Sequence, residues 1–295
     1  MSEIVQFLPS QAPASDGTEA VMPVMVNVEP TPEMSETERE LVKRLRTGRA
    51  ALPVLPQVAE AALRLANDPD ARIMDLAELV DTDPPIAARF MSVANSVAYW
   101  RGLVTSSTQS AIVRLGLANT RDLLFQVVYA ASSGGLKRYQ MQVQRSFRRS
   151  VIAAVAARTA ARELELESEY DYMSGLLHDI GEARIYRILD GLPKTDDQKL
   201  VTALVQRYHT AAGAEVAMAW KLPTEIVDAC AAHHDPAAAA VPHVRLVMIA
   251  DAVCDALDAG KSPKLERFEA LGVDVGMARR IIDQTKKAAT PNART

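Results

Sequence analysis

The feature that most limits the folds open to this chain is a long helical segment with an alanine-rich end. The spacing of apolar residues predicts a helix over residues 139–163, and its second half carries six alanines. The distance between two packed helices depends on the side chains at their contact, so small residues allow close approach. We therefore expect this helix to lie at the centre of the fold, with other helices packed around it.

The composition of the chain favours the same architecture. Its 295 residues are 48% hydrophobic but only 5% aromatic, and alanine and leucine dominate. Strands would require more β-branched and aromatic residues, and no stretch of the sequence has a strand pattern or an internal repeat. We therefore predict an all-α protein that can bury a large core.

The chain divides into segments of different character. As far as Glu38 it contains no lysine or arginine, seven acidic residues and five prolines, which is typical of a disordered or docking segment. A Ser-x-x-Glu capping box at residues 35–38 opens a helix, and a Ser-Ser-Gly-Gly run at residues 132–135 interrupts the helical pattern. We predict an acidic, proline-containing disordered tail over 1–34, a linker helix over 35–50, a domain over 51–259 with subdomains 51–135 and 136–259, and a C-terminal helical extension over 260–295.

Two local predictions concern interruptions of helices. Gly116 is expected to separate two short helices at residues 110–115 and 120–131. Residues 196–208 and 209–220 are expected to form a helical hairpin. His209 would then lie at the turn of that hairpin, where its ring could simply donate to a backbone carbonyl.

Charge and hydropathy argue against several functional classes. The formal net charge is −4 and no basic stripe is present, so nucleic-acid binding is not expected. No apolar run reaches the roughly 18 residues of a membrane span, and the N-terminus lacks the pattern of a signal peptide. The two cysteines, Cys230 and Cys254, lie in helical patterns without a CxxC motif, so we expect a reduced, cytoplasmic compartment.

A candidate site begins where the apolar run 173–177 ends in a histidine and an aspartate. Burying an imidazole and a carboxylate costs free energy unless they have partners. The pair His178-Asp179 either closes a helix end through a hydrogen bond or holds a metal. The pair His233-His234 is either one core and one surface histidine or part of the same site, and Asp251, inside an apolar run, also requires a partner. The candidate cluster comprises His178, Asp179, His209, His233, His234 and Asp251.

Several short motifs follow one another in order along the chain. The first half carries Leu-Pro-x-Leu-Pro at 52–56, the stretch 76–84, Asn-Ser at 95–96 and Ala-Ile-x-x-Leu-Gly at 111–116. The second half carries Leu-Leu-His-Asp-Ile-Gly at 176–181, Gly213, Trp-x-Leu-Pro at 220–223 and His-His at 233–234. Over about residues 52–259 this set resembles the HDOD family, the HD-related output domain of bacterial signalling proteins. The resemblance implies a helical N-terminal subdomain packed on an HD-superfamily-like helical core.

The resemblance also implies a metal site and a change in it. Phosphohydrolases of the HD superfamily hold metal with a first histidine, a later His-Asp pair, further histidines and a last aspartate. The six candidate residues match the later ligands, and such donors suit a divalent ion such as Mn, Fe or Mg. At the position of the first histidine this chain has Arg149, which has no free lone pair and cannot coordinate a cation. We hypothesise that Arg149 replaces the metal and pairs with Asp179 or Asp251.

Two further departures weigh against hydrolysis of cyclic di-GMP. Relatives of the HD-GYP type carry a lysine after His-Asp-x-Gly, whereas this chain has Glu182, which repels phosphate. The residues that follow His234 lack the Gly-Tyr-Pro signature.

We therefore expect a non-enzymatic signal-transduction module that binds a signalling protein or a small signal ligand and needs no cofactor. The alternative is a metal-dependent phosphohydrolase that acts on a nucleotide or another phosphoester. Arg145 and Arg148 form a local basic cluster with Arg149, which is either a solvated face or a contact for an anion.

Overall fold

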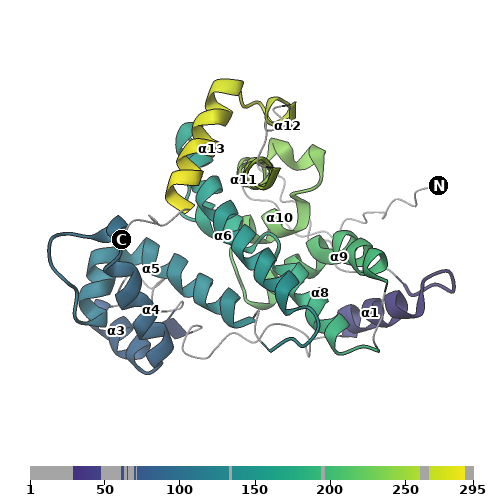
Figure 1. Ribbon diagram of the computed structural model, residues 1–295, viewed down its shortest axis with the longest axis horizontal. Helices are drawn as coiled ribbons and strands as arrows, with labels where there is room; N and C mark the ends of the chain where they lie inside the picture. Colours follow the sequence, from purple (N-terminus) through teal and green to yellow (C-terminus); the bar gives the residue numbers. More distant parts are fainter. Residues whose placement is uncertain are drawn as a thin grey trace. The chain divides into compact units, whose positions relative to one another are not determined.

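The computed structural model describes residues 29–47, 61–62, 65, 70, 72–132, 135–193, 197–259 and 266–289. These residues form helices and loops without a strand, which confirms the all-α prediction (Figure 1). The predicted tail as far as residue 28 and the motif at 52–56 lie outside the described residues. The chain divides into two compact units: unit 1 comprises Met1–Pro53 and Gly135–Thr295, and unit 2 comprises Val54–Gly134. No helix in these described ranges combines the length and the apolar character that crossing a bilayer requires.

Unit 1 is built around the predicted long helix, α6 (Gln140–Glu163). This helix contacts α7 (Asp171–Leu177), α8 (Ile180–Asp190), α11 (Pro242–Ala259) and α13 (Val275–Ala289). Around them lie α9 (Gln198–Ala219), which packs on α8 and α10 (Thr224–Ala232), the short 3-10 helix η3 (Pro236–Ala240) and α12 (Glu266–Ala270). The prediction that α6 lies at the centre is confirmed.

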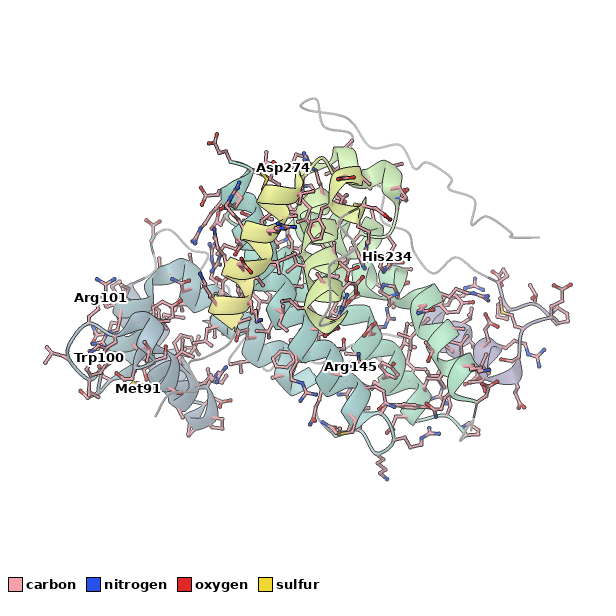
Figure 2. All side chains as sticks on the ribbon, turned by 45° about the horizontal axis from the view of Figure 1, so that its top comes forward. Met91, Trp100, Arg101, Arg145, His234 and Asp274 are labelled. Carbon is pink, nitrogen blue, oxygen red and sulfur yellow. The ribbon has the colours of Figure 1, made fainter. Side chains whose placement is uncertain are left out.

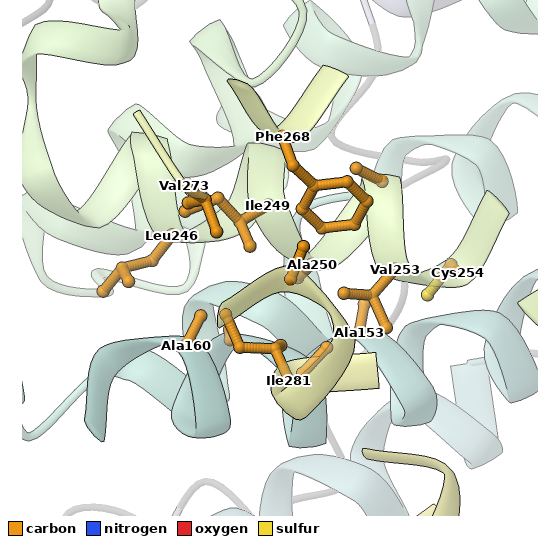
Figure 3. Close-up of a cluster of buried hydrophobic side chains, with 14 of the residues drawn as sticks. Ala153, Ala160, Leu246, Ile249, Ala250, Val253, Cys254, Phe268, Val273 and Ile281 are labelled. Carbon is orange, nitrogen blue, oxygen red and sulfur yellow. The ribbon is translucent and has the colours of Figure 1, made fainter. Parts of the chain in front are cut away.

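The alanines of α6 are what let so many helices approach it. Ala153 and Ala160 are fully buried against Ile249, Phe268 and Ile281 in one apolar core (Figure 3). On another side α7 approaches so closely that a Cβ atom added to Gly175 would lie 2.6 Å from the carbonyl oxygen of Ala153. Since real Cβ atoms do not come this close to backbone, the α6–α7 contact requires glycine at this position.

The predicted linker helix and the predicted C-terminal helical extension both contribute to the cores of unit 1. The predicted linker helix corresponds to α1 (Glu36–Thr47), which buries Leu41, Val42 and Leu45 in a core cluster with α8 and α9. Its Glu38 accepts hydrogen bonds from Arg207 at 2.7 Å and from the Tyr208 hydroxyl at 2.8 Å. The predicted C-terminal extension contributes α12 and α13 to the core around α6. Three apolar residues on one face of α1 thus have a partner surface on α8 and α9.

The predicted helical hairpin was wrong. Residues 198–219 form one continuous helix, α9, and His209 lies in its middle. No proline or glycine lies within three residues of His209, and the buried residues Val205, Tyr208 and Ala212 continue one apolar face through the position of the predicted turn. The spacing of apolar residues should therefore have outweighed the expectation of a break.

Unit 2 contains α3 (Ile73–Asp81), α4 (Pro84–Ala94), the 3-10 helix η2 (Val97–Tyr99) and α5 (Thr108–Ser132). The helices α3, α4 and α5 contact one another. Asp83 caps α4 by accepting a hydrogen bond from the amide of Ile86 at 3.2 Å. Gly116 interrupts α5 with a φ of 76°, a backbone conformation that favours glycine, so the two predicted short helices are two parts of a kinked one.

Candidate functional site

The His-Asp step lies at the junction of two helices in unit 1. His178 ends α7 and Asp179 begins α8, and both side chains are buried. His209 comes from the middle of α9, His233 from the end of α10, and Asp251 from α11. The structure thus brings the buried candidate residues together from five helices.

A glycine sets the distance between α8 and α9 at this site. A Cβ atom on Gly181 would lie 1.9 Å from the carbonyl oxygen of His209. Only a residue without a side chain lets the two backbones meet here, and the contact places His209 opposite Asp179. Gly181 is thus a positioning residue for the site, and the sequence motif Leu-Leu-His-Asp-Ile-Gly contains it for a steric reason.

Three histidines are oriented in the same way by backbone carbonyls. The Nδ1 atom of His178 lies 2.8 Å from the carbonyl oxygen of Gly175, that of His209 lies 3.1 Å from Val205, and that of His233 lies 2.9 Å from Ala229. A carbonyl can only accept, so each Nδ1 donates, and in the neutral ring Nε2 is then left as an acceptor.

These Nε2 atoms converge on the carboxylate of Asp179. The Oδ2 atom of Asp179 lies 3.0 Å from Nε2 of His178, and its Oδ1 atom lies 3.3 Å from Nε2 of His233 and 3.5 Å from Nε2 of His209. The Nε2 atoms of His209 and His233 are 3.3 Å apart. We call His178, Asp179, His209 and His233 the imidazole cluster. Acceptors that face acceptors in a buried site repel one another, so this cluster requires a positive charge, supplied by protons or by a metal ion.

The pKa values follow from this arrangement. Burial lowers the pKa of His178, but the adjacent Asp179 carboxylate outweighs it and raises the pKa to about 9. Burial lowers the pKa of His209 despite the attraction of Asp179. Burial and the repulsion of Asp179 raise the pKa of Glu182, a half-buried neighbour, to about 7. Of these two rings, the carboxylate of Asp179 thus favours a proton on His178, whereas burial disfavours a proton on His209.

His234 lies at the edge of the imidazole cluster and is exposed (Figure 2). Its ring centroid lies 4.2 Å from that of His233 and 5.0 Å from that of His209. Partial desolvation of the side chain and the two neighbouring imidazoles lower the pKa of His234 to about 4, so it is neutral near pH 7. A neutral imidazole at the rim of the site can serve as a ligand.

Arg149 does not enter the imidazole cluster but joins a group of carboxylates on α11. Its Nη2 atom lies 2.6 Å from Oδ1 of Asp251 and 2.7 Å from Oδ1 of Asp255, and its Nη1 atom lies 3.0 Å from Oδ2 of Asp258. Arg267 from α12 holds the other oxygen of Asp251 at 3.2 Å. We call Arg149, Arg267, Asp251, Asp255 and Asp258 the arginine cluster.

Of the two partners that we allowed for Arg149, the structure places Asp251 against its guanidinium. Sequence reasoning missed Asp255, Asp258 and Arg267. The sequence did indicate Asp255 and Asp258. They follow Asp251 at steps of four and three residues, and residues at these spacings share one face of a helix. Arg267 gave no signal, because it lies on a five-residue helix. Arg145, which is labelled in Figure 2, and Arg148 are exposed on α6. The charge of Arg145 acts on Tyr186.

The donors present fit a single divalent ion. The ligand atoms of His209, His233 and His234 lie within 4.8 Å of one another, and so do those of His178, Asp179 and His233. Imidazoles and a carboxylate suit a divalent transition metal, and carbonyls that hold Nδ1 are the usual outer contacts of metal-bound histidine. The Nε2 atom of His178 is buried without a hydrogen-bond partner of good geometry, as a ligand atom would be. Asp251 belongs to neither group, since arginines hold both of its oxygens.

An all-helical core with a His-Asp step at a helix junction and further imidazoles around it is the arrangement of the HD superfamily. Within it, the chain belongs to the HDOD family, because the model of the HDOD domain matches residues 52–236, more than half of its length.

Solved structures show the same fold. The chain superposes with a TM-score of 0.64 on a Shewanella amazonensis protein proposed to be a phosphohydrolase, at 19% identity over 85% of this chain and 97% of that one. An HDOD domain protein of unknown function from Geobacter sulfurreducens gives a TM-score of 0.56, at 23% identity over 86% of this chain and 95% of that one.

Curated relatives are longer proteins. An uncharacterised protein of Treponema pallidum is 22% identical over 194 residues, 62% of this chain and 38% of that protein. Ribonuclease Y of Lactobacillus gasseri is 26% identical over 217 residues, 73% of this chain and 34% of that enzyme. The chain therefore spans little more than a third of the length of these relatives.

Proposed function

We propose that this protein is a signal-transduction output module that acts by binding a protein partner or a small signal ligand and does not hydrolyse phosphoesters. The observation that carries the proposal is the state of Asp251. Arginines hold both of its carboxylate oxygens, and one of them, Arg149, stands where HD phosphohydrolases have their first histidine. A carboxylate paired in this way is not available to a cation, and a guanidinium cannot take the place of a ligand.

The charge balance of the arginine cluster supports this assignment. Three aspartates on one face of α11 are offset by two arginines, and the buried Asp251 lies between them. A metal ion beside Asp251 would have to displace a guanidinium that already makes contacts with three carboxylates. Catalysis with two ions, in which each ion stabilises one of the reacting oxygens, would therefore lack the first histidine and the carboxylate of Asp251.

A second candidate function is that of a metal-dependent phosphohydrolase with one ion, and the imidazole cluster favours it. His209, His233 and Asp179, with His178 or His234, would hold the ion. When bound, such an ion lowers the pKa of a water and polarises a phosphoryl oxygen. Glu182 beside the cluster, with a pKa of about 7, could exchange a proton near neutral pH. Once ionised, however, Glu182 repels the phosphate of a substrate.

The two candidates differ in metal-dependent turnover. Purified protein would be incubated with a panel of phosphoesters and nucleotides in the presence of Mn²⁺, and its metal content measured by mass spectrometry. We expect no turnover above that of an Asp179→Ala variant, and we expect Arg149→His to bind more metal than the wild type. Turnover by the wild type that requires Mn²⁺ and is lost in Asp179→Ala would overturn the proposal in favour of the hydrolase.

A further inference from the structure

Unit 2 exposes large apolar side chains in one short stretch. In the described part of the chain eight large hydrophobic residues are exposed, and six of these lie between residues 97 and 117. Single exposed apolar residues are normal, but a local concentration marks an interaction site. Four of the six lie on the connection between α4 and α5, and we call them the apolar loop residues: Val97 (78% exposed), Trp100 (50%), Leu103 (76%) and Val104 (69%).

Hydrogen bonds fix the loop that presents these side chains. Asn95 and Thr105 exchange two of them, with Asn95 Nδ2 donating to the Thr105 carbonyl at 3.0 Å and the Thr105 amide donating to Asn95 Oδ1 at 2.8 Å. Arg114 Nη2 donates to the carbonyl of Leu103 at 2.8 Å, which ties the loop to α5. The apolar loop residues are thus presented by a fixed backbone, so binding to them costs little ordering of the loop.

Positive charge accompanies the apolar loop residues. Arg101 follows Trp100 in the sequence and is exposed beside it at the margin of unit 2 (Figure 2). Within unit 2, a groove of about 630 Å³ is lined by Arg101, Leu103, Gln109, Ser110, Val113 and Arg114. From residue 84 to residue 121 the chain carries four arginines and no aspartate, glutamate or lysine. The surface therefore suits an occupant that is both anionic and apolar.

A carboxylate from α3 limits where the contact with an anion lies. Thr108 Oγ1, at the start of α5, donates a hydrogen bond to Oδ1 of Asp81 at 2.5 Å. The charge of Asp81 repels anions near the start of α5, whereas Arg101 attracts them beside the apolar loop residues. We therefore assign the contact with an anion to Arg101.

The shape and the charge of this surface distinguish three candidate occupants. In a symmetric dimer formed through this surface, the same arginines of two copies would face each other, which disfavours a second copy. The energetically dominant residues of protein interfaces lie in enclosed pockets, but the apolar loop residues project into solvent. The interfacial region of a bilayer accepts protruding side chains without a matching cavity. Tryptophan is enriched there, and anionic headgroups attract arginine. The observations therefore favour a lipid surface.

We propose that this surface of unit 2 docks on an anionic lipid bilayer. Trp100, Leu103 and Val104 enter the region between the headgroups and the acyl chains, and Arg101 contacts lipid phosphates. The contact is reversible, because it depends on a few side chains and on the attraction of anionic lipids. It involves none of the residues on which the proposed function depends.

Trp100 provides a direct probe of this contact, because the chain contains only two tryptophans. The full chain with Trp220→Phe would be titrated with vesicles of phosphatidylcholine and phosphatidylglycerol and, separately, with vesicles of phosphatidylcholine alone. We expect the anionic vesicles to shift the emission of Trp100 to the blue and to protect it from acrylamide. The uncharged vesicles should bind about tenfold more weakly, and high salt should weaken binding to the anionic ones. Sedimentation of the wild-type chain with the same vesicles repeats the measurement without the Trp220 substitution.

A pair of charge variants tests the role of Arg101. Arg101→Glu should weaken binding to the anionic vesicles about thirtyfold, because it reverses one charge at the lipid surface. Arg72→Glu makes the same change at an exposed arginine of unit 2 that is paired with Asp75 at 2.6 Å, and it should weaken binding less than about threefold, because solvent ions screen charges that lie away from the contact. Equal losses in the two variants would show attraction by net charge alone and would overturn the assigned contact.

Apolar variants test the insertion of the loop. Leu103→Asp and Val104→Asp should each weaken binding about tenfold or more, since each removes apolar area from the lipid contact. Met141→Asp, which alters an apolar residue of α6 that is 70% exposed, should have no effect. The far-ultraviolet circular dichroism of every variant would be compared with that of the wild type. A natively folded full chain that does not bind the anionic vesicles would overturn the proposal and favour an acidic segment of a partner protein as the occupant.

Discussion

The imidazole cluster and the arginine cluster lie in the same unit, and each contains a buried aspartate. They differ in the groups that balance the charge of that aspartate. In the arginine cluster, the buried carboxylate of Asp251 has a permanent cation against each of its oxygens. In the imidazole cluster, Asp179 is surrounded by ring nitrogens that are acceptors unless they bind a proton or an ion. The first cluster is complete with its own side chains, and the second is not.

This difference indicates which of the two clusters can change its protonation or bind an ion. A guanidinium stays charged at every accessible pH, so the arginine cluster acts as a fixed connection between α6, α11 and α12. The imidazole cluster can lose the proton of His178 as the pH rises toward 9, or bind an ion, and it connects α7, α8, α9 and α10. A signal that acts through this unit is therefore expected to act on the imidazole cluster.

The largest effect should come from a change that separates Asp179 from His209. Gly181→Ala places a Cβ atom where the carbonyl oxygen of His209 would be 1.9 Å away. Because only backbone can yield, we expect a loss of about 3 kcal/mol or more in the free energy of unfolding, measured in urea. The matched control is Gly213→Ala on the facing helix, where the nearest atoms lie at 3.3 to 3.5 Å; its cost should be within about 1 kcal/mol. Similar costs for both would show that the helix contact does not depend on Gly181.

The second-largest effect is expected in the pH dependence of the free energy of unfolding, which should differ between the two clusters. The pKa of His178 is raised to about 9, above its unfolded value of 6.5, by Asp179. The folded state then binds the extra proton, so stability is fully present below pH 6.5 and is lost as pH rises toward 9, by about 3 kcal/mol in total. The pKa of Glu182 is raised from 4.5 to about 7, so stability is also lost as the pH rises from 4.5 to 7. Urea unfolding across this range should show the decline.

Two variants assign that decline to its residues. Asp179→Asn should remove the part between pH 6.5 and 9, and Glu182→Gln the part between pH 4.5 and 7. In contrast, the pKa of Asp251 is lowered, with His178 and Arg149 outweighing burial, so its contribution is lost only as pH falls below the usual range of an aspartate. A decline that persists unchanged in both variants would contradict the assignment to the imidazole cluster.

The sequence predicted the elements of the fold for reasons that the structure makes plain. The alanines of 153–161 indicated a helix that others approach closely, and Gly116 indicated an interruption with its positive φ. Prediction from the sequence failed where contacts between helices distant in the chain determine the structure. Nothing local in residues 35–47 shows that Leu41, Val42 and Leu45 meet α8 and α9, so the sequence predicted this helix but not its contacts. The break assigned near His209 ignored an apolar face that continues through it.

The candidate site was predictable as a set of residues but not as two groups. The predicted set comprised His178, Asp179, His209, His233, His234 and Asp251, and all of them except His234 are buried. Their division depends on distances between helices, which the sequence does not contain. Only the structure shows that Asp179 faces imidazoles while Asp251 faces guanidiniums, and that Arg267 from a short helix takes part.

A smaller loss in the free energy of unfolding is expected when Arg149, which contacts all three aspartates of the arginine cluster, is replaced. Arg149→Met keeps much of the side-chain volume but leaves three aspartates of α11 with Arg267 alone. Asp251 is buried whereas Asp255 and Asp258 are half-exposed, so water screens part of the repulsion. We expect a loss of about 2 kcal/mol in urea unfolding. The loss should shrink at low pH, where aspartates are protonated. A stability equal to that of the wild type would mean that the cluster contributes no net stabilisation.

The smallest effect should come from Arg267→Met, because this arginine is 43% exposed and Arg149 still holds Asp251. A loss of about 0.5 kcal/mol is expected for such a pair. The variant is most informative in combination with Arg149→Met, because both arginines contact Asp251. The double variant should lose about 1 kcal/mol more in the free energy of unfolding than the sum of the two single losses. Arg280→Met, which alters an exposed arginine paired with Glu163 on α6, should add to Arg149→Met without such coupling. Additive losses for Arg149 and Arg267 would show that the two guanidiniums act on Asp251 independently and that the arginine cluster is not one connected unit.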